Sequence, residues 1–252
     1  MDRLHVATLN ILNLADRWSA RQGLIYADMA ALQPDLLALQ EVVYVIQQDR
    51  LIGAAGEGRY AAIRGWAGRP EYGNSLLLRE PLVADSEERL DLGLQRAAHR
   101  VRVALPGGSA AVVAVTHLHH PPNAHAERDR QAQALLSWLD ETAADGPPAD
   151  ATILAGDFNA GPDEPAYARI TAAGFRSGHL EANGREPEVT WPSGLIAPAM
   201  DRDGEPDCLD YIWIRGAIRT IDCRLVFDRP DPDDPTLYPS DHVGLAAHLE
   251  IG

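Results

Sequence analysis

The segment ILAGDFNAGPDEPAY, residues 153–167, places a carboxylate and a carboxamide two positions apart, at the point where an apolar run ends. In an extended chain Asp157 and Asn159 would project to the same side, while Phe158 between them can turn into the core. The pair would offer an anionic oxygen group and an amide donor and acceptor to one point in space. Such a pair suits a phosphoryl group and the water or metal beside it.

Polar residues at the ends of other predicted strands extend this pattern. Taken singly, each has a structural explanation, such as a turn or a solvated loop. Their recurrence favours one shared site, because the loops at one rim of a sheet sandwich are where sites are built. The residues concerned are Asn10, Glu41, His117, Asp157, Asn159, Asp210, Asp241 and His242.

The elements that must position these residues are short apolar runs alternating with helical patterns. Strands are predicted near 3–11, 35–42, 60–63, 74–79, 99–105, 110–118, 152–157 and 242–251. Helices are predicted from Ser19 to Gln33, from about Ala124 to Thr142 and from about Glu164. Ser19 is a possible N-cap of the first helix, and Pro34 stops it.

Residues 208–227, CLDYIWIRGAIRTIDCRLVF, have the pattern of a β-hairpin that turns at Arg215-Gly216. In that hairpin Cys208 and Cys223 would be cross-strand neighbours. Reduced thiols are favoured over a disulfide, because a cytoplasmic chain is kept reduced. Pairing of the two cysteines nevertheless stays open.

Length and composition set the outer limits. The 252 residues contain no linker of biased composition and no internal repeat, which favours a single domain over 1–252. A monomer is expected, although the oligomeric state stays open. No stretch has the apolar length of a transmembrane segment and the N-terminus lacks a signal-peptide pattern, so a cytoplasmic protein is expected. The net charge of −15 argues against a broad basic face, and therefore against a stable complex with nucleic acid. The chain has no lysine, which excludes Schiff-base chemistry.

Seven short motifs, in order along nearly the whole chain, resemble those of the endonuclease/exonuclease/phosphatase family, which includes deoxyribonuclease I. Each motif is weak alone, but the ordered set is highly specific. The resemblance implies an α/β fold, a four-layer α/β/β/α sandwich of two mostly antiparallel mixed sheets with helices outside and the site at one rim. The motifs are TLN at Asn10, LQEV at Glu41, THL at His117, GDFNAGPDE at Asp157, TW at Thr190, LDYIWI at Asp210 and SDHVGL at His242.

The resemblance also implies a role for each site residue, with water attacking phosphorus in line and a cation neutralising the developing charge. For the metal, Mg²⁺ or Mn²⁺, Glu41 would be the main ligand, with Asn10 and Asp241. Asp157 would polarise the water or assist a second metal. His242, oriented by Asp210, would lie beside the water or the scissile phosphate. Asn159, Asn10 and His117 would bind phosphate, and His117 could instead protonate the leaving group.

Within the family, His117 resembles the second histidine of the deoxyribonuclease and sphingomyelinase branches, which favours a phosphodiesterase acting on nucleic acid, a small molecule or a lipid headgroup. Val43 stands where apurinic endonucleases usually have lysine, which argues against abasic-site repair. Two alternatives remain: phosphomonoester hydrolysis, and a non-catalytic binding protein on the same fold.

Two loops could shape substrate choice. The acidic, proline-rich stretch 228–242 is either a solvated connector or a barrier to long polyanions that favours a small phosphodiester. The stretch 116–130 is rich in histidine but fits no zinc signature, so its polar residues either flank the substrate entrance or face solvent. These residues are His119, His120, His125, Arg128 and Arg130.

Overall fold

Two six-stranded mixed sheets form the centre of the computed structural model, which describes residues 1–56, 58–141, 149–198, 200 and 203–252. The first sheet has the order β11-β12-β1-β2-β4-β3. Its strands are β11 (Ile218–Val226), β12 (Gly244–Ile251), β1 (Asp2–Asn10), β2 (Leu36–Val43), β4 (Tyr72–Arg79) and β3 (Tyr60–Gly65).

The second sheet has the order β5-β6-β7-β8-β10-β9. Its strands are β5 (Ala84–Gly93), β6 (Arg96–Ala104), β7 (Ala110–His117), β8 (Ala151–Asp157), β10 (Asp210–Gly216) and β9 (Arg176–Ser177). Among the described strands, β1 and β2 pair in parallel, as do β7 and β8, and the other pairs are antiparallel.

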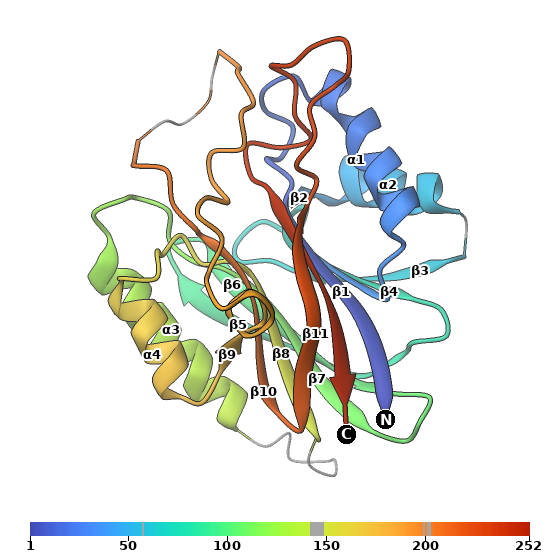
Figure 1. Cartoon of the computed structure of the whole chain (residues 1–252), viewed down its shortest axis with the longest axis vertical. Helices are drawn as coiled ribbons and strands as arrows, with labels where there is room; N and C mark the ends of the chain where they lie inside the picture. Colours follow the sequence, from blue (N-terminus) through green and yellow to red (C-terminus); the bar gives the residue numbers. More distant parts are fainter. Residues whose placement is uncertain (57, 142–148, 199, 201–202) are drawn as a thin grey trace.

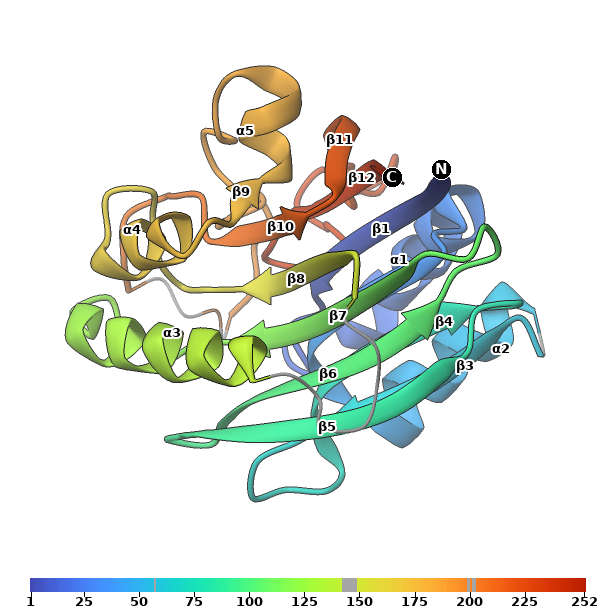
Figure 2. The same ribbon diagram turned by 90° about the horizontal axis from the view of Figure 1, so that it is seen from below.

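Helices cover the outer faces of the two sheets, so the predicted α/β/β/α sandwich is confirmed (Figures 1 and 2). On the first sheet lie α1 (Trp18–Leu32), the π-helix η1 (Tyr44–Gln48) and α2 (Asp49–Ala55). On the second lie α3 (His125–Asp140) and α4 (Pro165–Ala172), and α5 (Gly178–Asn183) lies beside β11. The helix predicted from about Ala124 corresponds to α3, and its predicted end at Thr142 lies outside the described residues.

The start of α1 differs from the prediction. Trp18 is the first helical residue, and Arg17 before it is left-handed at φ 62° with no side-chain cap, so Ser19 is not the N-cap. The guanidinium of Arg17 donates to the carbonyl oxygen of Thr236 and forms an ion pair with Asp234. Long-range contacts therefore fix this helix start, rather than a local capping residue.

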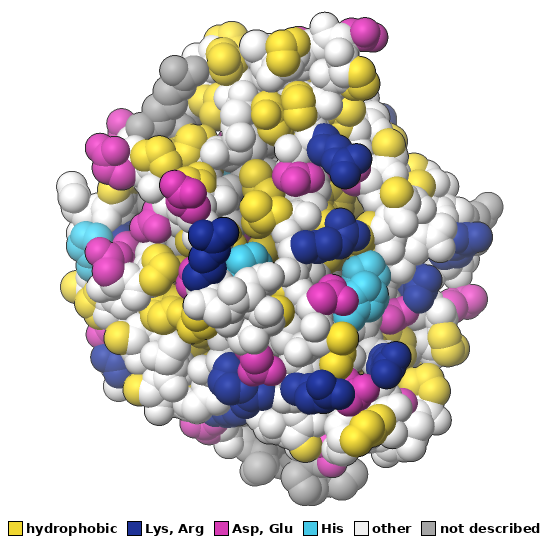
Figure 3. All heavy atoms as spheres, in the orientation of Figure 1, with side chains coloured by type: hydrophobic (Ala, Val, Ile, Leu, Met, Phe, Trp, Pro, Cys, Tyr) yellow, Lys and Arg dark blue, Asp and Glu magenta, His cyan; other side chains and the backbone are white. Residues whose placement is uncertain are grey.

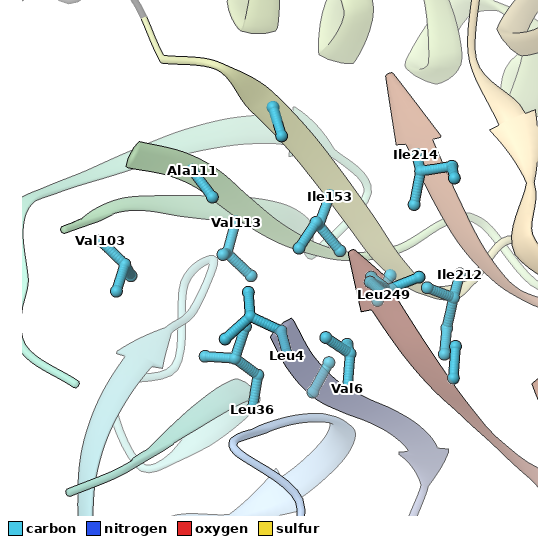
Figure 4. Packing of buried hydrophobic residues seen from close by; sticks show 14 of the residues in the cluster. Leu4, Val6, Leu36, Val103, Ala111, Val113, Ile153, Ile212, Ile214 and Leu249 are labelled. Atoms are coloured by element: carbon cyan, nitrogen blue, oxygen red, sulfur yellow. The ribbon is translucent and has the colours of Figure 1, made fainter. Parts of the chain in front are cut away.

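The inter-sheet layer is the core that holds the two sheets in register (Figure 4). Alternate residues of each strand face this layer because successive side chains of a strand point to opposite faces. Each fully buried aliphatic side chain stabilises the fold by about 1.5–3 kcal/mol. Members of this cluster include Leu4, Val6, Leu36, Val113, Ile153, Ile212, Ile214 and Leu249.

The predicted hairpin at Arg215-Gly216 is wrong, because β10 and β11 belong to different sheets. Gly216 has φ 97°, and a Cβ there would lie 2.5 Å from the carbonyl oxygen of Asp150. The glycine therefore allows a close backbone approach where the chain crosses between sheets. Cys208 packs in the layer outside the second sheet and Cys223 in the inter-sheet layer, so they are not cross-strand neighbours, and both are free.

The carboxyl ends of the two parallel pairs gather at one rim, opposite the chain termini (Figure 1). The loops that follow β1 and β7 lie at this rim, as does the loop that precedes β12. None of the described helices has the length and apolarity needed to cross a membrane.

Candidate active site

A cavity of about 500 Å³ opens at the rim where the two sheets meet. Seven of the eight predicted site residues line it, and the eighth, Asp210, is fully buried behind His242. The lining residues from the prediction are Asn10, Glu41, His117, Asp157, Asn159, Asp241 and His242.

Asn10, the last residue of β1, connects the acids of the two sheets. Its Nδ2 lies 2.9 Å from Asp157 Oδ2 and 3.4 Å from Glu41 Oε1. Glu41 has φ 60°, and the pairing of β2 with β4 is irregular at this point. Asn13 Nδ2 donates to Glu41 Oε2 at 2.7 Å. A left-handed residue in a strand is a local strain, and here two amide donors hold its carboxylate.

His117 and Asp157 are opposite each other at the ends of β7 and β8, with His117 Nε2 3.4 Å from Asp157 Oδ2. Burial, reinforced by the nearby charge of Arg96, holds the pKa of His117 well below its usual value, so the ring is neutral. Burial raises the pKa of Asp157 to about 6, against the opposing effect of His242. Asp157 thus titrates closer to neutral pH than an exposed aspartate does.

Asn159 does not continue an extended chain, contrary to the expectation. Its φ is 49°, its backbone N–H donates to Asp157 Oδ1 and its Nδ2 donates to the carbonyl of Leu118. A turn, rather than strand alternation, therefore brings Asn159 and Asp157 to the same cavity. Phe158 is buried in the core, as expected.

His242 Nδ1 lies 2.8 Å from Asp210 Oδ2, and His242 Nε2 lies 3.7 Å from Asp157 Oδ2. Burial disfavours the charged ring, but Asp210 and Asp157 outweigh it and raise the pKa of His242 well above its usual value. Thr190 fixes this pair, because its Oγ1 accepts from the Asp210 N–H at 3.1 Å and its carbonyl accepts from the Val243 N–H at 2.8 Å.

Asp241 is buried beside Glu41. Trp191 Nε1 lies 3.3 Å from Asp241 Oδ2, and the hydroxyl of Ser240 donates to the carbonyl of Asn10 at 2.6 Å. Burial raises the pKa of Asp241, and the charge of Glu41 adds to the effect. Two carboxylates that disfavour each other's charge are suited to a shared cation.

The donor set fits a hard divalent cation. Eight of the described residues that line the cavity are acidic, against two arginines, and Asp210 Oδ1 is buried with no hydrogen-bond partner within the described part of the chain. Oxygen donors of this kind are those that Mg²⁺ and Mn²⁺ prefer. A further possible ligand group joins Asp157, Asp210 and His242, whose nearest atoms lie within 4.8 Å of one another.

Several residues that line the cavity were not identified from the sequence. Trp191 belongs to the TW motif but had no assigned role. The spacing of the two asparagines in NILN could have suggested that Asn13 lies near Asn10 at the site. Tyr72 and Arg96 had no signal, since a lone tyrosine or arginine in a strand is unremarkable. From the histidine-rich loop, His120 and Arg128 line the cavity. Among the described residues of 228–242, the lining side chains are those of Asp241 and His242.

Comparison with known proteins identifies the family. The sequence matches the model of the endonuclease/exonuclease/phosphatase family over residues 7–242. Members of this family are generally divalent-metal-dependent phosphoester hydrolases. No curated protein matches the sequence significantly.

Solved structures share the fold. A Bacteroides vulgatus protein of this family superposes with a TM-score of 0.81 at 18% identity, covering 100% of both chains. The human Nocturnin catalytic domain with bound sulfate gives 0.79 at 23% identity, over 100% of this chain and 97% of that one. TDP2 from D. rerio, complexed with single-strand DNA product, gives 0.80 at 18%, over 98% and 99%. The chain described here belongs to the endonuclease/exonuclease/phosphatase family.

Proposed function

We propose that the protein is a divalent-metal-dependent phosphodiesterase that uses water as its nucleophile. The observation that carries this proposal is the convergence of Glu41, Asp157 and His242 on one cavity, from elements of both sheets. The hydrogen bond between His242 and Asp210 completes an acid–base group behind the cavity wall.

Glu41, Asp241 and Asn10 are the proposed metal ligands. All three offer oxygen, whereas both ring nitrogens of His242 already face carboxylates, which suits a proton better than a metal. A bound Mg²⁺ or Mn²⁺ would neutralise negative charge developing on the phosphate. In the structure Asn10 Oδ1 accepts from the Leu12 N–H, which leaves one lone pair of that oxygen for a ligand.

Asp157 is the proposed base toward the water. A base works best with a pKa near the operating pH, and the pKa of Asp157, about 6, meets this condition. His242, held protonated by Asp210, is the proposed cationic donor to a phosphate oxygen. Asn159 and His117 are the proposed further phosphate contacts, and His117 favours a diester as substrate.

The proposed substrate is small. Acidic residues dominate the cavity lining, and acidic and basic side chains are interspersed over the face shown in Figure 3. The acidic lining of the cavity would repel a long polyanion. The proposal includes the monomeric, cytoplasmic state expected from the sequence, with which two free buried cysteines agree.

The test is hydrolysis of bis-p-nitrophenyl phosphate and p-nitrophenyl phosphate with and without Mg²⁺ or Mn²⁺. We expect metal-dependent release, faster from the diester, that Glu41→Ala and His242→Ala each reduce by roughly 10³-fold or more. His248→Ala is the matched control, because that histidine is exposed and pairs with Asp222 outside the cavity. Faster release from the monoester would favour the phosphatase alternative. Absence of both turnover and metal binding would favour a binding protein.

A further inference from the structure

Arg96, the first residue of β6, lies in the cavity and has no acidic partner among the described residues. Its Nη1 lies 2.8 Å from His117 Nδ1 and its Nη2 lies 2.9 Å from His120 Nδ1. Over the described residues, no carboxylate forms an ion pair with it. The other arginine of the lining, Arg128, is held by Glu164 at 2.8 Å. Arg96 therefore brings an unneutralised positive charge to a cavity whose wall is mainly acidic.

Exposure to solvent increases along these contacts, from His117 through Arg96 to His120. His117 is 4% exposed and contacts Asp157, Arg96 is half-buried, and His120 is exposed. His117 thus lies between Arg96 and the proposed base, Asp157. An anion held by Arg96 and His120 would lie beside a phosphate bound by His117 and His242, on the side that faces solvent.

The acidic part of the cavity mouth comes from a different segment. Asp203, Glu205 and Asp207 belong to the long loop between α5 and β10, whereas Arg96 and His120 belong to β6 and the loop after β7. A guanidinium offers five N–H donors in a planar fork that matches the oxygens of a phosphate. The two imidazoles occupy only part of this capacity.

We infer that Arg96 and His120 form an anion-binding subsite beside the scissile phosphate, and that the preferred substrates carry a second phosphate group. This inference rests on the proposed function, since it places the subsite relative to the phosphate that is hydrolysed. The competing assignment is that Arg96 contacts the scissile phosphate itself. The two assignments differ in which substrates lose activity when Arg96 is replaced.

Binding of thymidine 5′-monophosphate, thymidine 5′-diphosphate and thymidine 3′,5′-bisphosphate, measured by calorimetry, tests the subsite without turnover. We expect the wild type to bind at least one doubly phosphorylated ligand roughly 10-fold tighter than the monophosphate, the size of one charge-assisted hydrogen bond. Arg96→Gln should remove this difference, Arg96→Lys should keep part of it, and Arg102→Gln on the same strand should keep all of it. Equal binding of the three ligands by the wild type would overturn the subsite.

Hydrolysis separates the two assignments. The p-nitrophenyl ester of thymidine 5′-monophosphate and its 3′-phosphorylated counterpart share the scissile group and differ by one phosphate. We expect Arg96→Gln to lower kcat/KM roughly 10-fold for the phosphorylated ester and less than 3-fold for the other. An equal loss with both esters would assign Arg96 to the scissile phosphate and overturn the inference. If neither ester is hydrolysed but the difference in binding persists, the subsite stands and the proposed reaction fails.

Discussion

The units β1-α1-β2 and β7-α3-β8 occupy equivalent places in the two sheets, yet they present side chains of different chemistry to the cavity. Each is a parallel pair flanked by antiparallel strands, and the two sheet orders correspond strand for strand. The first unit presents Asn10 and Glu41 to the cavity, and the second presents His117 and Asp157. One scaffold used twice thus offers proposed metal ligands from one unit, and the proposed base with a proposed phosphate contact from the other.

The two units also share a buried arginine at the fourth residue of the helix. Arg21 of α1 donates to six carbonyl groups, and Arg128 of α3 donates to three carbonyls and to the carboxylate of Glu164. Both side chains are fully buried. Each arginine holds an irregular loop at the cavity rim, but Arg21 also holds Pro239, close to Asp241 and His242. The first unit is therefore tied more directly to the proposed metal ligands.

The largest expected effects distinguish the role of Glu41 from that of Asp157. Glu41→Gln should weaken Mn²⁺ binding by roughly 100-fold, because it removes the charged ligand. Asp157→Asn should change Mn²⁺ affinity by less than about 10-fold but lower kcat for a diester by roughly 10³-fold, as expected for loss of a base. Calorimetry and steady-state kinetics measure these two effects. Equal loss of Mn²⁺ affinity in both variants would contradict the division of roles between the units.

Smaller effects should distinguish the two arginines. Arg21→Met and Arg128→Met should each lower the free energy of unfolding by about 3 kcal/mol, because each leaves buried acceptors without donors. Arg21→Met should in addition weaken Mn²⁺ binding about 10-fold, since the loop with Asn13 loses its support. Urea unfolding and calorimetry provide the two readouts, with Arg21→Lys as the variant that keeps the charge. A larger loss of Mn²⁺ affinity in Arg128→Met would reverse the comparison.

The smallest effect concerns pH. His99 on β6 and Leu245 on β12 occupy equivalent positions in the two sheets, and both side chains face the inter-sheet layer. Burial lowers the pKa of His99 to about 3, and neither ring nitrogen has a partner among the described residues. As pH falls below 6.5, His99 is protonated in the unfolded chain but not in the folded one. The free energy of unfolding therefore decreases progressively until about pH 3.

His99→Leu would remove this pH dependence and make the two sheets alike. The wild type should lose about 2 kcal/mol more than the variant between pH 7 and pH 5, measured by urea unfolding. At pH 7 the two should differ by about 1 kcal/mol or less. Identical slopes of unfolding free energy against pH would show that His99 is not the group responsible.

Local patterns predicted the strand ends at Asn10, His117 and Asp157, because an apolar run followed by a polar residue is visible in the sequence there. The predicted strand end at Glu41 was wrong, because β2 continues to Val43. Local patterns do not show which sheet a strand joins, so they predict a hairpin of β10 and β11, whereas these strands belong to different sheets. The largely polar edge strand β5 was missed, since its alternation buries few side chains. Arg96 was missed because its contacts with His117 and His120 form only when β6 and β7 pair, and a single arginine in a strand gives no sign of them.

The hydrogen bond from Asn10 to Asp157 joins the last residues of two strands in different sheets. The proposed metal ligands and the proposed base therefore keep their spacing only while one sheet stays in place over the other. A slip of a fraction of an ångström in the distant inter-sheet layer would be transmitted to this bond as a misalignment of the reacting groups. The turnover rate should therefore fall with core substitutions that shift the two sheets slightly but are too mild to unfold the protein.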